Sequence, residues 1–297
     1  EAYYAETPVY AVISGTVEGP WAPVHHFCEN TKLPCLFPTT DLPVIDESDF
    51  YSIYTDRGMT LEADGIASHI RQDLGAAAKV VQFYSTGDIK AETAANALAV
   101  DLRQAGIPFE DVVLTPQAVV GADVLIDDET LLVVWGDGAV LNQVSAQLGV
   151  DRLPRRVYLT TRLFGVDPTA IPDALFDRTY LIHSQEMPDK LTRLLIRSTG
   201  WFRAKRIYSP QAKQIQANAY FALKAAGGAL KLTRGYFYRE YFVEKIENMI
   251  DNANYTSVYP RISLAADQRF VAKGFYMAKP VKNGVKKLEA VTEWSIP

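Results

Sequence analysis

The sequence predicts an α/β protein built from parallel sheets with helices on both faces. Short apolar stretches alternate along the chain with stretches of helical periodicity, which is the order that βαβ units produce. The apolar stretches are continuous, as expected for strands that are buried on both faces. With 297 residues, 48% of them hydrophobic, the chain is long enough for more than one globular unit.

The first part of the chain predicts three strands and two helices. The helices cover residues 24–31 and 59–74, and the second carries apolar side chains on one side, at Leu61, Ile66, Ile70 and Leu74. The strands are expected at 8–15, 33–38 and 50–55. They are the first candidates for one sheet.

The middle of the chain predicts a second group of strands. We expect them at 79–85, 111–116, 130–136 and 155–161, followed by a further strand at 179–184. Helices are predicted at 90–105 and 139–148, and each is followed by a glycine, Gly106 or Gly149, as is common where helices end.

The last third predicts helices at 190–199, 212–232 and 238–252, and then a late β element. Apolar and polar residues alternate from Phe270 onward, so a half-buried strand is expected there. Gly274 within this run predicts a bulge or a close backbone approach.

These elements predict two lobes that the chain enters more than once. Residues 1–75 and 183–255 are assigned to the first lobe, and residues 76–182 and 256–297 to the second. Repeated crossings predict a hinge and a cleft, with ligand at the carboxyl ends of the strands.

Composition excludes several classes of function. The net charge of −5 and the pI of about 5.5 argue against a nucleic-acid partner. The sequence has no apolar run near the roughly 18 residues of a membrane span. It also lacks HExxH, a P-loop and the spacing of a Ser–His–Asp triad, so we do not expect an enzyme.

The two cysteines, Cys28 and Cys35, lie seven residues apart in one short segment. A disulfide that closes this loop is the leading interpretation and would suit an oxidising compartment. A metal site with His25 or His26 and a pair of free core thiols are the alternatives. No CxxCH is present, so the sequence carries no signature for covalent haem attachment.

Stretches from Pro8 almost to the C-terminus resemble the type I periplasmic binding proteins, in particular the branched-chain amino acid and amide group of ABC importers. The stretches are PVYAVISG, KLPCLFPTTDLP, AAAKVVQFYSTGDIKAETAANALAVDLRQAG and IQANAYFALKAAGGALK. A closer similarity is to a subgroup whose members often carry an upstream cytochrome c domain. It is carried by HHFCENTKLPCLFP, FYSIYTDRGMTLEA, REYFVEKIENM, YPRISLAADQRFVAKGFY and EWSIP.

The resemblance implies a two-lobed periplasmic solute-binding protein that closes on a small polar or anionic metabolite and works with an ABC permease. It also implies that the first βαβα unit of the N-lobe, about 75 residues, is missing before Pro8. We therefore expect a processed or partial chain. No cofactor is expected in this chain, and haem c is expected only in an upstream domain.

The resemblance also suggests a ligand site. In the family, the loop that corresponds to Ser14, Gly15 and Thr16 supplies hydroxyls and backbone N–H groups to a ligand carboxylate. Thr39 and Thr40, at the next strand end, are expected to complete the same pocket. For each of these loops, an ordinary βα turn is the alternative.

Further site residues are expected in the second lobe. Trp135 is predicted to form an apolar wall, and Asp137 to meet a ligand ammonium. Thr161 and Arg162 follow the next strand, where the family often has an acidic group. Arg162 at this place favours an anionic ligand over an amino acid.

A second hypothesis belongs to a different class of function. The chain is then a structural or docking subunit of a periplasmic redox complex, with a cytochrome partner, and keeps the binding-protein fold without the ligand. His69 and His183 are expected to be structural, and the aromatic cluster from Tyr236 to Tyr241 is expected to pack or to dock a partner chain.

Overall fold

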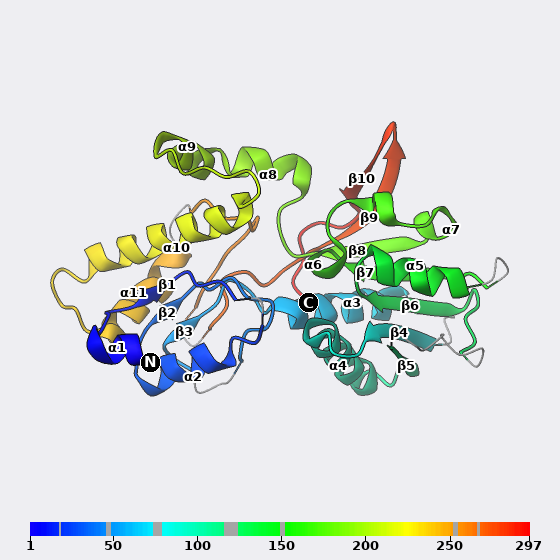
Figure 1. Cartoon of the computed structure of the whole chain (residues 1–297), viewed down its shortest axis with the longest axis horizontal. Helices are drawn as coiled ribbons and strands as arrows, with labels where there is room; N and C mark the ends of the chain where they lie inside the picture. The colour runs from blue at the N-terminus through cyan, green and yellow to red at the C-terminus, as the bar shows by residue number, and fades with distance from the viewer. Residues whose placement is uncertain are drawn as a thin grey trace. The chain divides into compact units, whose positions relative to one another are not determined.

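The computed structural model describes residues 1–17, 19–45, 49–73, 79–115, 124–148, 152–251, 255–265 and 268–297. The chain forms two compact units (Figure 1). Unit 1 comprises Glu1–Gly58 and Asp189–Lys273, and unit 2 comprises Met59–Pro188 and Gly274–Pro297. Within the described ranges, no helix has the length and apolar character needed to cross a membrane.

Unit 1 contains a parallel sheet of three short strands in the order β1-β2-β3. The strands are β1 (Val12–Ile13), β2 (Cys35–Leu36) and β3 (Ser52–Ile53). Val12 lies beside Cys35, and Cys35 lies beside Ser52. The strand ends of this small sheet therefore lie on one edge, as in the predicted arrangement.

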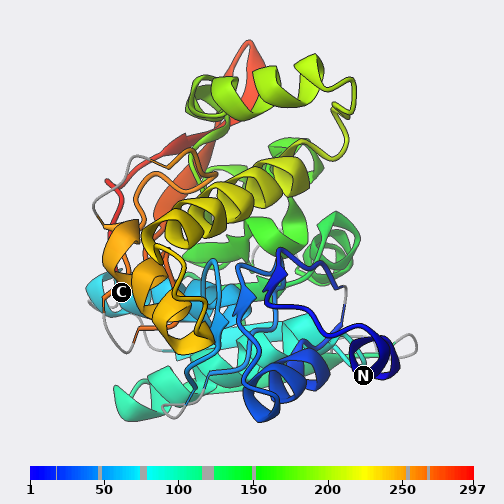
Figure 2. The ribbon, with the colours of Figure 1, turned by 90° about the vertical axis from the view of Figure 1, so that its left-hand side faces the viewer.

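Helices cover both faces of this sheet, as Figure 2 shows. Because side chains alternate along a strand, Cys35 and Leu36 point to opposite faces. Cys35 packs with Cys28 and Leu33 below helix α2 (Ala22–Asn30), near α1 (Ala2–Glu6). Leu36 packs against α10 (Lys213–Leu232) and α11 (Arg239–Ile250). Helices α8 (Pro188–Leu194) and α9 (Ile196–Ala204) precede α10 in the chain.

Unit 2 contains a seven-stranded sheet in the order β10-β9-β8-β7-β6-β4-β5. Five parallel strands form most of it: β4 (Lys79–Ser85), β5 (Phe109–Leu114), β6 (Thr130–Trp135), β7 (Arg156–Thr160) and β8 (Thr179–His183). The antiparallel pair β9 (Tyr276–Asn283) and β10 (Val285–Ala290) extends the sheet beyond β8. The chain reverses its direction of strand addition between β4 and β6, which is where ligands bind in open α/β sheets.

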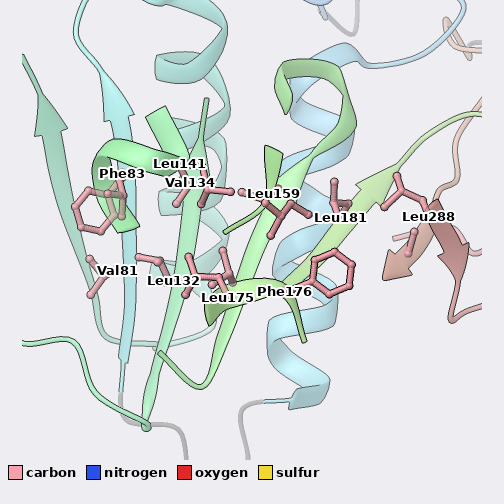
Figure 3. Close-up of a cluster of buried hydrophobic side chains, with 14 of the residues drawn as sticks. Val81, Phe83, Leu132, Val134, Leu141, Leu159, Leu175, Phe176, Leu181 and Leu288 are labelled. Carbon is pink, nitrogen blue, oxygen red and sulfur yellow. The ribbon is translucent and has the colours of Figure 1, made fainter. Parts of the chain in front are cut away.

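The core of unit 2 lies between the sheet and its helices (Figure 3). Val81 of β4, Val134 of β6 and Leu159 of β7 pack against Leu141 of α5 (Gly138–Gln147) and Leu175 of α7 (Asp173–Phe176). The remaining helical segments of this unit are α3 (Gly58–Asp73), α4 (Ile89–Gln104), α6 (Thr161–Phe164) and the 3₁₀ turn η1 (Pro168–Ala170). The α/β class with parallel strands flanked by helices is confirmed.

The limits of the lobes differ from those that we predicted. The predicted limits at residues 75, 182 and 255 lie at 58, 188 and 273 in the structure. Helix α3 belongs to unit 2 because it packs on that unit's sheet. A Cβ atom on Gly65 would lie 2.1 Å from Ile182 Cδ1, and His69 Nδ1 is 3.1 Å from the Tyr158 hydroxyl.

Other differences concern individual elements. The stretch predicted as one helix at 190–199 is two helices, α8 and α9, and the short elements α1, α6, α7 and β10 were not predicted. The late strand begins at Tyr276 rather than at Phe270. Leu74 and Gly149, which we used to predict helix faces and ends, lie outside the described residues.

The close backbone approach predicted at Gly274 is confirmed. A Cβ atom at this position would lie 2.6 Å from the carbonyl oxygen of Ser295 and 2.6 Å from Nε1 of Trp294. The neighbouring Phe275 pairs with Ser295 in an antiparallel bridge. Glycine is therefore required where the C-terminal segment runs beside the start of β9.

Candidate functional site

In unit 1, the loops that follow β1 and β2 lie side by side. Thr39 N–H donates to the Gly15 carbonyl at 2.7 Å, and Thr16 and Thr39 form a parallel bridge. Ser14 adopts a left-handed φ of 55°, which turns the chain directly after the strand. Ser14, Gly15, Thr16 and Thr39 therefore lie in two adjacent loops.

Trp21 fixes the position of the first loop. A Cβ atom on Gly15 would lie 2.5 Å from Cη2 of the Trp21 ring, so only glycine allows the loop to lie this close. Trp21 itself is buried, and its main-chain N–H donates to the Leu42 carbonyl. The loop is thus held on an aromatic platform that belongs to the same unit.

The two threonines after β2 have different environments. Asn218 Nδ2 of α10 donates to Thr39 Oγ1 at 3.3 Å, and Thr39 is partly exposed. Thr40 is buried, and its Oγ1 accepts the Leu42 N–H at 3.1 Å. The Thr40 hydroxyl therefore closes a turn, whereas the Thr39 hydroxyl accepts from Asn218 and the Thr39 main chain contacts Gly15 and Thr16.

In unit 2, Asp137 lies at the carboxyl end of β6 and is exposed. Its Oδ1 accepts the N–H groups of Ala139 and Val140, at 2.9 and 3.0 Å, and so caps α5. Asp88 caps α4 after β4 in the same way. Two carboxylates thus lie at the carboxyl ends of β4 and β6, the pair of strands where the order reverses.

Trp135 does not form the exposed apolar wall that the sequence analysis expected. Its side chain is completely buried, and Nε1 donates to Gln82 Oε1 at 2.8 Å. Gln82 in turn donates to the Ala95 carbonyl of α4. Through Gln82, the Trp135 side chain therefore lies on the face of the sheet that α4 covers, and not towards solvent.

Arg162 lies in a polar cluster at the carboxyl ends of β7 and β8. Its Nε is 3.0 Å from Glu62 Oε1 of α3, and its Nη2 donates to Ser184 Oγ at 3.1 Å. Ser184 Oγ donates to the same Glu62 oxygen at 2.9 Å. The positive charge of Arg162 is therefore balanced within unit 2, which removes the argument that this residue favours an anionic ligand.

Thr161 and His183 form the neighbouring part of this cluster. Thr161 Oγ1 and His183 Nδ1 are 2.8 Å apart, and His183 Nε2 is 3.1 Å from the Glu186 carbonyl. Since a carbonyl only accepts, Nε2 carries the proton, and Nδ1 accepts from the threonine hydroxyl. Burial lowers the pKa of His183, which keeps the ring neutral.

Cys28 and Cys35 form a disulfide, as the leading interpretation predicted. The disulfide joins α2 to β2 in the core of unit 1. Because both sulfur atoms are in this bond, the alternatives of a cysteine metal site and of free thiols are wrong.

The sequence analysis missed Glu62, Ser184 and Asn218. Glu62 had a usable signal because it lies four residues before Ile66 and eight before Ile70, on the apolar side of its helix. Asn218 has a similar signal, since Phe221 and Ala222 on the same side of α10 are buried. A polar residue on an apolar helix face predicts a buried hydrogen bond.

Comparisons of the sequence itself found no relative: neither a protein-family model nor a curated protein matches it. Comparisons of the structure found many similar folds. A branched-chain amino acid ABC transporter protein from Thermus thermophilus with bound valine aligns with a TM-score of 0.66 at 13% identity, over 96% of this chain and 78% of that one.

Two further structures give similar values. A leucine-binding protein from Thermotoga maritima aligns with a TM-score of 0.63 at 16% identity, over 97% of this chain and 82% of that one. A fatty acid ABC transporter substrate-binding protein from Thermomonospora curvata aligns with a TM-score of 0.63 at 14% identity, over 100% and 78%. At these identities the likeness shows the fold.

Proposed function

We propose that this chain, which has the fold of the type I periplasmic binding proteins, is a solute-binding protein for a small polar metabolite. The observation that carries the proposal is the pairing of the loops after β1 and β2 in unit 1. Thr39 N–H donates to the Gly15 carbonyl, and Thr16 bridges Thr39, so these hydroxyl-bearing residues and Ser14 belong to two adjacent loops, which supports the proposal.

The chemistry of these loops suits a polar ligand. Hydroxyl groups both donate and accept, so they can bind a carboxylate, an amide or an alcohol without burying a counter-charge. In unit 2, exposed Asp137 offers an acceptor for an ammonium or hydroxyl group at the carboxyl end of β6. Arg162 adds no net positive charge, because Glu62 balances it.

The ligands named for the similar structures are the first compounds to test. The named structures bind leucine or valine, or belong to a fatty acid transporter. We propose that the ligand of this chain is bound without bond cleavage, in the periplasm, and delivered to an ABC permease. Closure of the two lobes on the ligand remains a prediction of the resemblance.

A thermal-shift screen tests this function. A compound present at 100 times its Kd stabilises the folded chain by about 2.7 kcal/mol. Amino acids, amides, carboxylates and the products of alcohol oxidation should be screened, and at least one is expected to raise Tm. If the folded protein shows no shift with any of these classes, the proposal is contradicted.

Thr39→Val and Thr31→Val provide the matched comparison for any compound that raises Tm. Thr31 lies in the same unit, and its hydroxyl donates to the Phe27 carbonyl at the end of α2. Loss of one hydroxyl contact is expected to cost about 1 kcal/mol, which corresponds to roughly 5-fold weaker binding for Thr39→Val. Thr31→Val should keep wild-type affinity.

A second role is favoured by one specific observation. Tyr236, Phe237 and Tyr238 between α10 and α11 are exposed by 66%, 63% and 69%. Consecutive aromatic residues that are exposed to solvent are typical of protein interfaces. We propose, as the alternative, docking to a periplasmic cytochrome or another redox protein. Stable association of the purified chain with a haem protein, lost in a Tyr236→Ser/Phe237→Ser variant, would support it, and retention in that variant would contradict it.

A further inference from the structure

We infer that His25, Glu29 and Asp49 of unit 1 form a binding site for a divalent first-row transition-metal ion, with zinc as the test case. One possible ligand atom from each of the three side chains lies within 4.8 Å of the other two. This site is separate from the loops after β1 and β2, and it does not depend on the proposed ligand-binding function.

The local structure brings the three side chains together for a simple reason. His25 and Glu29 are four residues apart on α2, so they project from the same face of the helix. Asp49 lies just before β3, and its Oδ1 is 3.1 Å from His25 Nε2. In tetrahedral zinc sites with bonds of about 2.0–2.1 Å, neighbouring ligand atoms are about 3.3 Å apart.

The surroundings fix the ligands in place. His25 Nδ1 lies 2.7 Å from the Tyr54 hydroxyl, and the two rings are stacked with planes 14° apart. With Nε2 on a metal, Nδ1–H donates to Tyr54 Oη, which is the kind of support that metal-binding histidines have. The proposed ligand nitrogen is thus oriented before any ion binds.

Glu29 also positions the segment that carries Asp49. Its carboxylate accepts the N–H of Phe50 at 3.0 Å and the N–H of Tyr51 at 3.1 Å. These contacts hold the main chain directly after Asp49 against α2. A carboxylate oxygen has more than one lone pair, so these hydrogen bonds are compatible with metal binding.

Burial and charge select the class of ion. The side chains of His25 and Asp49 are only 3% and 7% exposed. Two carboxylates and a neutral imidazole balance a charge of +2, and a nitrogen ligand disfavours Mg²⁺ and Ca²⁺. Arg269 is a cation near the site, but its guanidinium donates to the Asp49 main-chain carbonyl and pairs with Glu247.

Zinc titration by calorimetry tests the site on the intact chain after treatment with a chelator. We expect saturable binding of one Zn²⁺ per chain. Asp49→Asn and Glu29→Gln keep the size of each side chain and should each weaken binding at least about 10-fold. His26→Ala is the matched control, because His26 is an exposed histidine beside His25 on the same helix.

Two results would overturn the inference: no saturable zinc binding by the folded wild-type chain, or binding that is lost in His26→Ala and kept in Asp49→Asn. Zinc X-ray absorption on the wild-type protein gives an answer that does not depend on the folding of any variant. We expect nitrogen and oxygen ligands at about 2.0–2.1 Å with an imidazole signature. Sulfur at about 2.3 Å, or a fully hydrated ion, would contradict the site.

Discussion

Glu62 and Arg162 form a buried ion pair inside unit 2. The Glu62 Oε1 and Arg162 Nε atoms are 3.0 Å apart, and the two side chains are 0% and 12% exposed. Ser184 bonds to both residues. The pair therefore connects α3 to the first turn of α6, and it holds Arg162 in one orientation at the carboxyl end of β7.

Glu62→Gln should destabilise the protein by about 3 kcal/mol, because it removes the negative charge that pairs with the Arg162 guanidinium in a largely buried position. Urea unfolding measures this change. Glu289→Gln is the control, since Glu289 pairs with Lys287 at the surface, where both side chains are about half exposed. That variant should lose no more than about 0.5 kcal/mol. Equal losses in the two variants would contradict the structural role of the buried pair.

Trp135→Phe separates a core role from a ligand-binding role. The variant removes the donor to Gln82 Oε1, so a buried acceptor loses its partner at a cost of about 1–3 kcal/mol. Stability measured by urea unfolding should fall. Affinity for any ligand found by thermal shift should stay within about 2-fold of wild type, since Trp135 is completely buried. Weaker ligand binding with unchanged stability would instead support the prediction that Trp135 forms an apolar wall of the ligand site.

The Cys28–Cys35 disulfide should stabilise unit 1 by about 2.5 kcal/mol, the chain-entropy value for so short a loop. A Cys28→Ala/Cys35→Ala variant should therefore unfold at lower urea concentration than the oxidised wild type. Reduction of the wild-type protein with a thiol should shift its midpoint to nearly the same place. A reducing agent that leaves the wild-type midpoint unchanged would argue against the bond.

His183 should make stability depend on pH. Burial lowers its pKa in the folded chain below the ordinary value near 6.5, so the unfolded chain binds this proton more tightly. The neutral ring's contribution to the free energy of unfolding is fully present above about pH 6.5, and it is lost as the pH falls below that value. Urea unfolding should be measured between pH 7 and 5. The free energy of unfolding should fall less steeply with falling pH in His183→Gln than in wild type. Identical slopes would contradict this assignment.

Much of the fold could be predicted because it depends on local pattern. The strand at Lys79–Ser85 was predicted at its observed bounds, and Leu61, Ile66 and Ile70 do lie on the buried side of α3. The lobe limits could not be predicted in this way. Which sheet α3 packs on depends on a contact between residues far apart in sequence, where Gly65 meets Ile182.

The candidate site, too, could be predicted where it depends on local pattern and not where it depends on contacts between distant residues. The position of Ser14, Gly15 and Thr39 follows from their places at the ends of parallel strands, and they lie in two adjacent loops. Whether a polar side chain is available to a ligand depends on its partners in three dimensions. Arg162 is bound to Glu62, one hundred residues away in sequence, and Trp135 is bound to Gln82 on a neighbouring strand.

The central claim is that the chain binds a small polar metabolite through the loop pair of unit 1. Isothermal titration of the best compound from the thermal-shift screen tests it most directly, with wild type, Thr39→Val and Thr31→Val measured side by side. The account predicts saturable binding of one molecule per chain, about 5-fold weaker in Thr39→Val and unchanged in Thr31→Val. Absence of saturable binding, or equal affinity in all three folded proteins, would contradict it.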